Sequence, residues 1–113
     1  MGDSSYALEK LGLAIYEMTV GEGDIRSRLR TTFRQMCAIS EKDFPEELMK
    51  DWVSIINRLT KRVSDLKDTP YDEGNFEATL FRMRRKTASK IAADIVDLHS
   101  RLEGIIKDGY KDS

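Results

Sequence analysis

The longest helical pattern in this chain occupies residues 76–107, FEATLFRMRRKTASKIAADIVDLHSRLEGIIK. Apolar residues recur there at steps of three and four, which is the spacing of one face of an α-helix. The pattern predicts one long helix from Phe76 to about Lys107. Two apolar stripes run along it, the first comprising Phe76, Leu80, Met83, Thr87, Ile91, Leu98, Leu102 and Ile105. The second stripe comprises Phe81, Ala88, Ala92, Ile95, His99, Leu102 and Ile106.

Three further helices are predicted ahead of this one from the same spacing. The first spans Ser5 to about Thr19 and the second spans Ile25 to about Ala38. The third begins at Phe44-Pro45 and ends at Thr69-Pro70, because a residue that precedes proline avoids the helical region. The inward stripe of this third helix is predicted to contain Leu48, Trp52, Ile55, Leu59, Val63 and Leu66.

Turn-forming residues mark the predicted helix boundaries. Gly21 suits the C-cap of the first helix, where a left-handed residue is expected, and Asp24 suits the N-cap of the second. Residues 71–74 are predicted to form a turn that leads to Asn75 as the N-cap of the long helix. Gly109 is the predicted C-cap of that helix.

Four helices joined by short loops indicate an all-α fold, namely an up-and-down antiparallel four-helix bundle with two short and two long helices. The 113 residues fit a single helical domain over 1–113, with short disordered ends expected at 1–4 and 109–113. No segment shows the two-residue alternation of a β-strand, so no sheet is expected. The predicted core contains Phe33, Trp52, Leu59, Leu80, Ile91 and Ile15.

The unequal predicted lengths suggest a homodimer. A long helix of about 48 Å outruns the helix that would pair with it, and its last turns carry Leu102, Ile105 and Ile106. Exposed apolar turns are costly in water, and a second copy of the same chain would cover them with two-fold symmetry. These three residues are therefore the candidate dimer interface.

Two stretches are rich in basic residues and contain no acid, namely 25–40 and 78–93. Such clusters would contact the phosphates of RNA or DNA, or would pair with acidic residues of the same or another chain. The second interpretation is favoured, because acidic residues flank both stretches and no exposed aromatic residues are interleaved with the basic ones. The candidate contacts to an anion or to nucleic acid are Arg26, Arg30, Arg34, Arg82, Arg85 and Lys86.

The sequence contains no recognisable catalytic or metal site. His99 is the only histidine and Cys37 the only cysteine, so neither a multi-cysteine zinc site nor an internal disulfide is expected. His99 is expected to be packed or half-exposed, and Cys37 to be a thiol of the core. No cofactor and no enzymatic activity are predicted.

Charge and composition favour a protein that acts by binding. The net charge is −1 with 35% charged residues, so no global basic footprint is present and any nucleic-acid contact must be local. No apolar run approaches the length of a membrane span, and a reducing, cytoplasmic location is expected. The leading hypothesis is a non-enzymatic regulator or adaptor that acts through protein–protein contacts, with no membrane contact. The alternative is a nucleic-acid-binding module that uses the two arginine-rich stretches.

Overall fold

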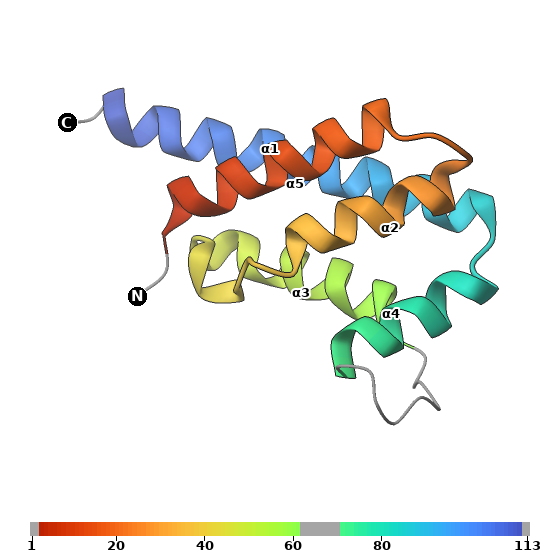
Figure 1. Ribbon diagram of the computed structural model, residues 1–113. Coiled ribbons are helices and arrows are strands. Elements are labelled where there is room, and N and C mark those ends of the chain that lie inside the picture. Colours follow the sequence, from red (N-terminus) through yellow and green to blue (C-terminus); the bar gives the residue numbers. More distant parts are fainter. Residues whose placement is uncertain (1–2, 62–70, 112–113) are drawn as a thin grey trace.

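A computed structural model describes residues 3–61 and 71–111 of the chain. All regular structure in these residues is helical, and no strand is present in them. Figure 1 labels five α-helices. Their bounds are α1 Ser4–Val20, α2 Ile25–Met36, α3 Glu46–Leu59, α4 Tyr71–Arg82 and α5 Arg85–Lys111, and a short 3-10 helix, η1, spans Glu41–Asp43.

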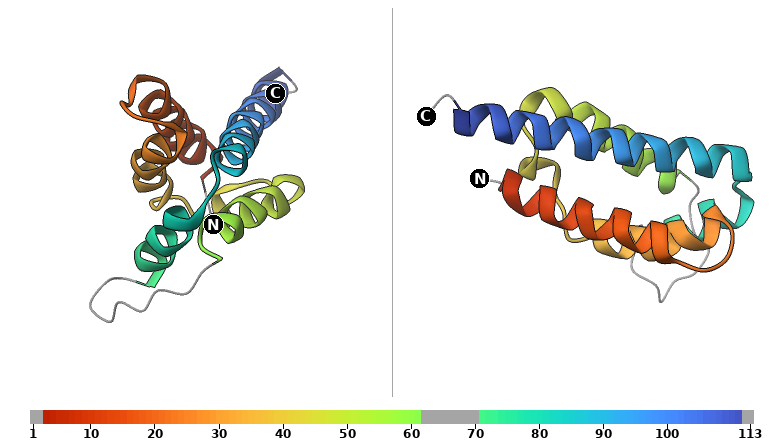
Figure 2. Two further views of the ribbon diagram at one scale, coloured as in Figure 1. Left: turned by 90° about the vertical axis from the view of Figure 1, so that its right-hand side faces the viewer. Right: turned by 90° about the horizontal axis from the view of Figure 1, so that it is seen from above.

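The helices pack mainly in antiparallel neighbours (Figures 1 and 2). α1 and α2 form a hairpin, and α5 runs back along α1 on one side and along α3 on the other. The start of α1 and the end of α5 lie at the same end of the molecule. The α1–α2 turn and the junction of α4 with α5 lie together at the opposite end. This second end brings the two arginine-rich stretches close to each other.

The turn between α1 and α2 is held by a capping aspartate. The Asp24 carboxylate accepts hydrogen bonds from the amides of Arg26 at 2.9 Å and Ser27 at 3.3 Å, as its predicted N-cap role requires. Gly21 is the C-cap of α1, but its φ of −66° is not left-handed, so that part of the prediction is wrong. The left-handed residue is Gly23, whose φ is 87°.

The connection between α2 and α3 contains η1, which the sequence analysis did not predict. Its N-cap Ser40 and its last residue Asp43 form a capping box, in which the Asp43 carboxylate accepts the Ser40 amide at 2.9 Å. The same carboxylate accepts the Asp3 amide at 2.9 Å. Asp3 is in turn the N-cap of α1, so the Asp43 carboxylate connects the beginning of α1 to η1.

The two hydrogen bonds to Asp43 make its protonation state matter for stability. The amides of Ser40 and Asp3 hold the pKa of this carboxyl below its ordinary value of 3.8. A lowered pKa adds stability above that ordinary value, and the added stability is lost as pH falls through the folded-state pKa. We expect Asp43→Asn to lower the free energy of unfolding at pH 7 by at most about 1 kcal/mol, because the site is open to solvent. Urea unfolding at pH 7 and at a series of lower pH values tests this: the difference from wild type should shrink as the pH falls below 3.8 and Asp43 becomes protonated. A difference that does not change with pH would contradict it.

The third helix ends earlier than predicted. α3 stops at Leu59 and Thr60 is its C-cap, with the Thr60 hydroxyl donating to the Ile56 carbonyl at 2.7 Å. The predicted stripe positions Val63 and Leu66 and the predicted stop at Thr69-Pro70 lie outside the described residues. At its other end, Pro45 is the N-cap and Glu46 is the first helical residue.

The predicted long helix is two helices, which is why five helices replace the expected four. The α-helical pattern stops after Arg82, and Met83 and Arg84 form a non-helical link before α5 begins at Arg85. Residues 71–74 are the first turn of α4 rather than a separate turn. Asn75 is consequently not an N-cap; it lies inside α4 and is buried. α5 also passes through the predicted cap at Gly109 and ends at Lys111.

The core lies where all the helices meet, and it confirms most of the predicted buried residues. Phe33, Trp52, Leu59, Leu80 and Ile91 are buried, and Ile15 is partly buried against them. The rings of Phe33 and Phe76 stack with centroids 4.0 Å apart and join α2 to α4. The Phe44 and Trp52 rings stack at 4.9 Å below η1. The prediction for Cys37 is wrong, because this residue follows the last turn of α2 and is exposed.

Candidate binding surface at the junction of α4 and α5

Three of the candidate contacts, Arg26, Arg30 and Arg34, follow one another at steps of four on one face of α2, and they differ in their partners. Arg26 pairs with Asp24 at 3.0 Å, and Arg30 makes two bonds to Glu77 of α4 at 2.9 and 3.1 Å. Arg34 forms no ion pair with a residue that the structure describes. Two of the three positive charges on this face are therefore used within the chain.

The pKa values agree with this pairing. The hydrogen bond from the Arg26 side chain, followed by the amide of Ser27, lowers the pKa of Asp24. The hydrogen bond to Glu77 raises the pKa of Arg30. Both shifts in pKa favour the charged form of the group concerned, Asp24 in one pair and Arg30 in the other. The pairs are exposed to solvent, so each contributes little to stability.

The start of α2 is fastened to the junction between α4 and α5. The Arg26 guanidinium donates to the carbonyl of Met83 at 3.4 Å. Arg85, the first residue of α5, lies 3.5 Å from the Asp24 carboxylate. These contacts gather basic residues from three helices at one end of the molecule. We call this group the basic corner, and it consists of Arg26, Arg82, Arg84, Arg85 and Lys86.

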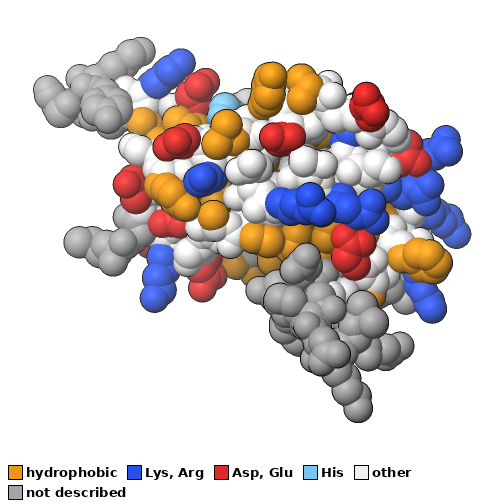
Figure 3. All heavy atoms as spheres, viewed as in Figure 1, with side chains coloured by type: hydrophobic (Ala, Val, Ile, Leu, Met, Phe, Trp, Pro, Cys, Tyr) orange, Lys and Arg blue, Asp and Glu red, His pale blue; other side chains and the backbone are white. Residues whose placement is uncertain are grey.

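Figure 3 shows how this charge is distributed on one face of the molecule. Lys and Arg side chains form a row at the level of α2 and gather at the end where α4 meets α5. Within the described residues, Arg82, Arg84 and Lys86 have no acidic partner. The basic corner therefore combines paired residues, which build the corner, with unpaired ones, which are available to a ligand.

Phe81 is the functional candidate that the sequence analysis missed. Its relative exposure is 86%, the highest among the large exposed hydrophobic residues of the described chain. α4 buries the side of the helix that carries Phe76, Thr79 and Leu80, and Phe81 follows Leu80 by one residue and so points away. Burying a phenylalanine is worth about 1.5–3 kcal/mol, and the folded chain leaves this gain unused. An exposed ring next to unpaired cations is the arrangement expected of a contact residue.

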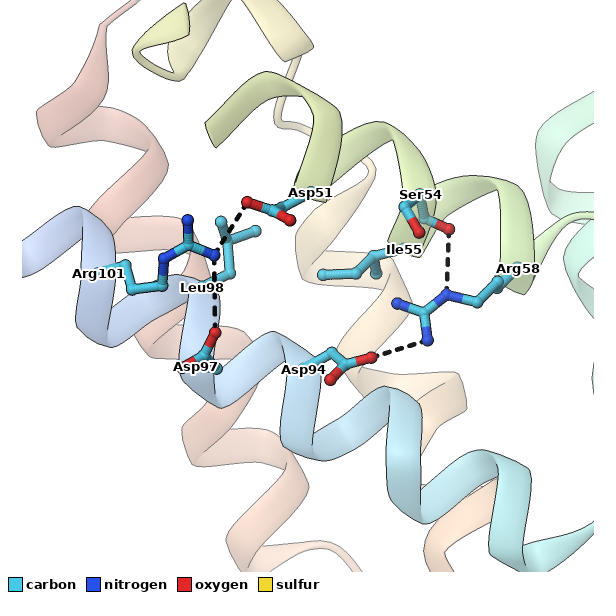
Figure 4. Close-up of a pocket in the computed structure, with 8 residues that line it drawn as sticks. All are labelled: Asp51, Ser54, Ile55, Arg58, Asp94, Asp97, Leu98 and Arg101. Carbon is cyan, nitrogen blue, oxygen red and sulfur yellow. Dashed lines mark hydrogen bonds and ion pairs between the residues drawn. The ribbon is translucent and has the colours of Figure 1, made fainter. Parts of the chain in front are cut away.

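A hollow with a polar lining lies between α3 and α5, and its charged groups pair with one another (Figure 4). It measures about 400 Å³. Arg58 of α3 bonds Asp94 of α5 at 2.7 Å, and Arg101 of α5 bonds Asp51 of α3 at 2.9 Å. The guanidinium of Arg58 also donates to the Ser54 carbonyl at 3.3 Å. These bonds join the two helices and leave no unpaired charge in the groove to recognise a ligand.

The predicted dimer residues lie in a different environment from the one expected. Leu102 is completely buried within a single chain, and Ile105 and Ile106 are half-buried against the same core. α1 runs along α5 and helps to bury its apolar side. The predicted overhang came from comparing the lengths of the third and fourth predicted helices only, and it left out the first helix. Leu102 is thus unavailable to a partner, whereas parts of Ile105 and Ile106 remain accessible.

The remaining candidates show no reactive arrangement. His99 is half-buried beside Gly12, where a Cβ atom would lie 3.6 Å from its Nε2 atom. Among the described residues, no group of three His, Cys, Asp or Glu side chains is placed to hold a metal ion.

The described helices also include none with the length and apolar character needed to cross a membrane. Comparison of the chain with protein-family models, with curated proteins and with solved structures finds no match.

Proposed function

We propose that this protein is a non-enzymatic adaptor or regulator that binds a partner protein through Phe81 and the basic corner. The observation that carries the proposal is the 86% exposure of Phe81 beside cations that lack a described acidic partner. Aromatic and arginine residues dominate the binding energy of protein interfaces when an apolar socket receives the ring. The complementary surface is an apolar socket surrounded by carboxylates. A cytoplasmic location is part of this proposal, because the exposed thiol of Cys37 suits a reducing compartment.

A protein partner accounts for the corner better than a nucleic acid does. Binding to a single strand uses several aromatic residues on which successive bases stack, whereas Phe81 is the one exposed ring beside the corner among the side chains that the structure describes. Arg26 and Arg30 are also held by Asp24 and Glu77, which lowers the net positive charge facing a phosphate backbone. Nucleic-acid binding stays the second candidate because Arg34, Arg82, Arg84 and Lys86 are unpaired within the described chain.

Phe81→Ala is expected to weaken binding of the partner by about thirtyfold, the effect of losing about 2 kcal/mol at an interface hot spot. The measurement is affinity capture with the tagged protein from nuclease-treated extract of its source cells, followed by quantitative mass spectrometry. Tyr16→Ala is the matched control, because Tyr16 is an aromatic residue of α1 with a relative exposure of 61%. Partners should be retained by wild type and by Tyr16→Ala and lost with Phe81→Ala.

Two outcomes would contradict the proposal. Capture of the same proteins by Phe81→Ala would show that the ring is not a contact residue. Loss of all captured proteins on nuclease treatment, together with tight and salt-sensitive binding to RNA or DNA, would favour the nucleic-acid alternative.

A further inference from the structure

A second hollow lies within the basic corner, where the end of α3 approaches the junction of α4 and α5. It measures about 200 Å³. Three of its six lining residues carry a positive charge, and no acidic residue of the described chain lines it. The lining residues are Lys61, Thr79, Arg82, Met83, Arg84 and Thr87.

The polar groups around this hollow are arranged to donate hydrogen bonds. Lys61, Arg82 and Arg84 form no ion pair within the described residues, so their donors face solvent or a ligand. The Thr79 hydroxyl donates to the Asn75 carbonyl at 2.8 Å and is used inside α4. The Thr87 hydroxyl has no such partner in the described chain, and it belongs to the first turn of α5, whose amides lack acceptors within the helix.

Like charges placed around one small hollow repel each other, and an anion would remove that repulsion. The anion must be compact to fit, and it must present several acceptors to three separate cations. A phosphomonoester meets both conditions, because it has a charge of about −1.5 to −2 and three strongly accepting oxygens. A phosphodiester of a nucleic-acid backbone has one charge per phosphate and fits the cluster less well. A carboxylate has two oxygens and one charge, so it satisfies fewer of these donors.

We propose that this hollow binds the phosphate of a phosphoserine or phosphothreonine side chain on the partner protein. The inference rests on the proposed function, since it assigns the chemistry of the partner that Phe81 contacts. Arg82 lines the hollow and directly follows Phe81 in the sequence. An apolar residue of the partner that is close to its phosphorylated residue would therefore contact the ring of Phe81. Phosphorylation of the partner then controls whether the complex forms.

The test is an NMR titration of the full chain with defined probes. Acetyl-Gly-phosphoserine-Gly-amide should shift the amide signals of Arg84 and Thr87, and the same peptide with glutamate should bind at least about tenfold more weakly, because it lacks the second charge and third oxygen. Affinity for the phosphopeptide should rise from pH 5 to pH 7.5, because the second ionisation of the phosphate has a pKa of about 6.

Substitutions assign the site. Arg84→Gln and Lys61→Gln should each weaken binding of the phosphopeptide by about tenfold, the typical effect of removing one charge-assisted hydrogen bond. Lys90→Gln is the matched control, because Lys90 is an exposed cation of α5 that does not line the hollow. Circular dichroism of each variant should match wild type, since the substituted side chains are exposed.

Each alternative has its own signature. Equal binding of the phosphopeptide and the glutamate peptide, or equal loss with Lys90→Gln, would overturn the assignment. Binding of inorganic phosphate without the phosphopeptide would indicate a site for the free anion, and tighter, pH-independent binding of a single-stranded oligothymidylate would indicate nucleic acid. If partner capture depends on Phe81 but survives phosphatase treatment of the extract, the proposed function stands and the phosphate assignment fails.

Discussion

Phe76→Ala is expected to lower the free energy of unfolding by about 3–5 kcal/mol, the range for truncating a buried phenylalanine. Phe76 is 2% exposed and its ring stacks on that of Phe33 at 4.0 Å, so truncation opens a cavity between α2 and α4. A domain of this size has a total stability of about 5–15 kcal/mol, so the substitution should remove a large fraction of it. Denaturant unfolding followed by circular dichroism provides the measurement.

Phe81→Ala is the matched control for this substitution, since both phenylalanines belong to α4 and only one is buried. Its stability should lie within about 0.5 kcal/mol of wild type, as for exposed surface positions in general. The pair therefore separates folding from binding: the first variant loses structure and the second loses only the partner. Equal destabilisation by the two substitutions would show that the assigned phase of α4 is wrong.

Leu102→Ala is expected to lower the free energy of unfolding by about 2–5 kcal/mol, because the side chain is completely buried within one chain. The loss should be independent of protein concentration, as it is for a core residue of a single chain. If the residue were covered by a second copy, the stability would rise with protein concentration through mass action. Unfolding measured over a hundredfold range of concentration distinguishes the two cases.

Ile106→Ala provides the comparison at the same end of α5. Ile106 is half-buried, so its truncation should cost less than that of Leu102. Light scattering on the Ile106→Asp variant still tests the homodimer hypothesis, which now depends on the accessible parts of Ile105 and Ile106. A wild-type midpoint that rises with protein concentration, together with a midpoint for Ile106→Asp that does not, would support the homodimer.

Helix content and most core positions were predictable because the three-four spacing of apolar residues reports directly which face of a helix is buried. The cap at Asp24 was predictable for the same kind of local reason, since a carboxylate there satisfies free amides wherever the rest of the chain lies. Leu102 was correctly predicted to lie on an apolar stripe. It was predicted to be buried by a second copy of the chain, whereas residues of its own chain bury it. Cover depends on which helix packs alongside, and spacing within one helix does not contain that information.

The break between α4 and α5 is hidden in the spacing of the sequence. The predicted stripe passes from Met83 through Thr87 to Ile91 at steps of four, so it predicts one continuous helix. In the structure Thr87 is exposed, and the next buried position after Met83 is Ala88, a step of five. No proline or glycine accompanies the break, so no residue signalled it locally.

The exposure of Phe81 could not be predicted because that residue had been placed on the second stripe. Phe81 belongs to α4 and Ala88 to α5, so the two residues do not lie on one face of a single helix. Ala88 is buried and Phe81 is exposed. The hollow of the basic corner depends on the same division, since Arg84 and Thr87 flank the new helix start. Lys61 joins them only because the end of α3 reaches this junction, which is a long-range contact.

The placement of the two helix ends has a practical consequence for how the molecule can be attached to something else. The start of α1 and the end of α5 lie at one end, and the α4–α5 junction lies at the other (Figure 2). α5 has 27 residues, so about 40 Å separates its two ends. A surface, a fluorescent protein or a second domain joined to either terminus is therefore held roughly one molecule's length from the basic corner. The proposed contact surface and the two ends of the described chain therefore lie at opposite ends of the molecule.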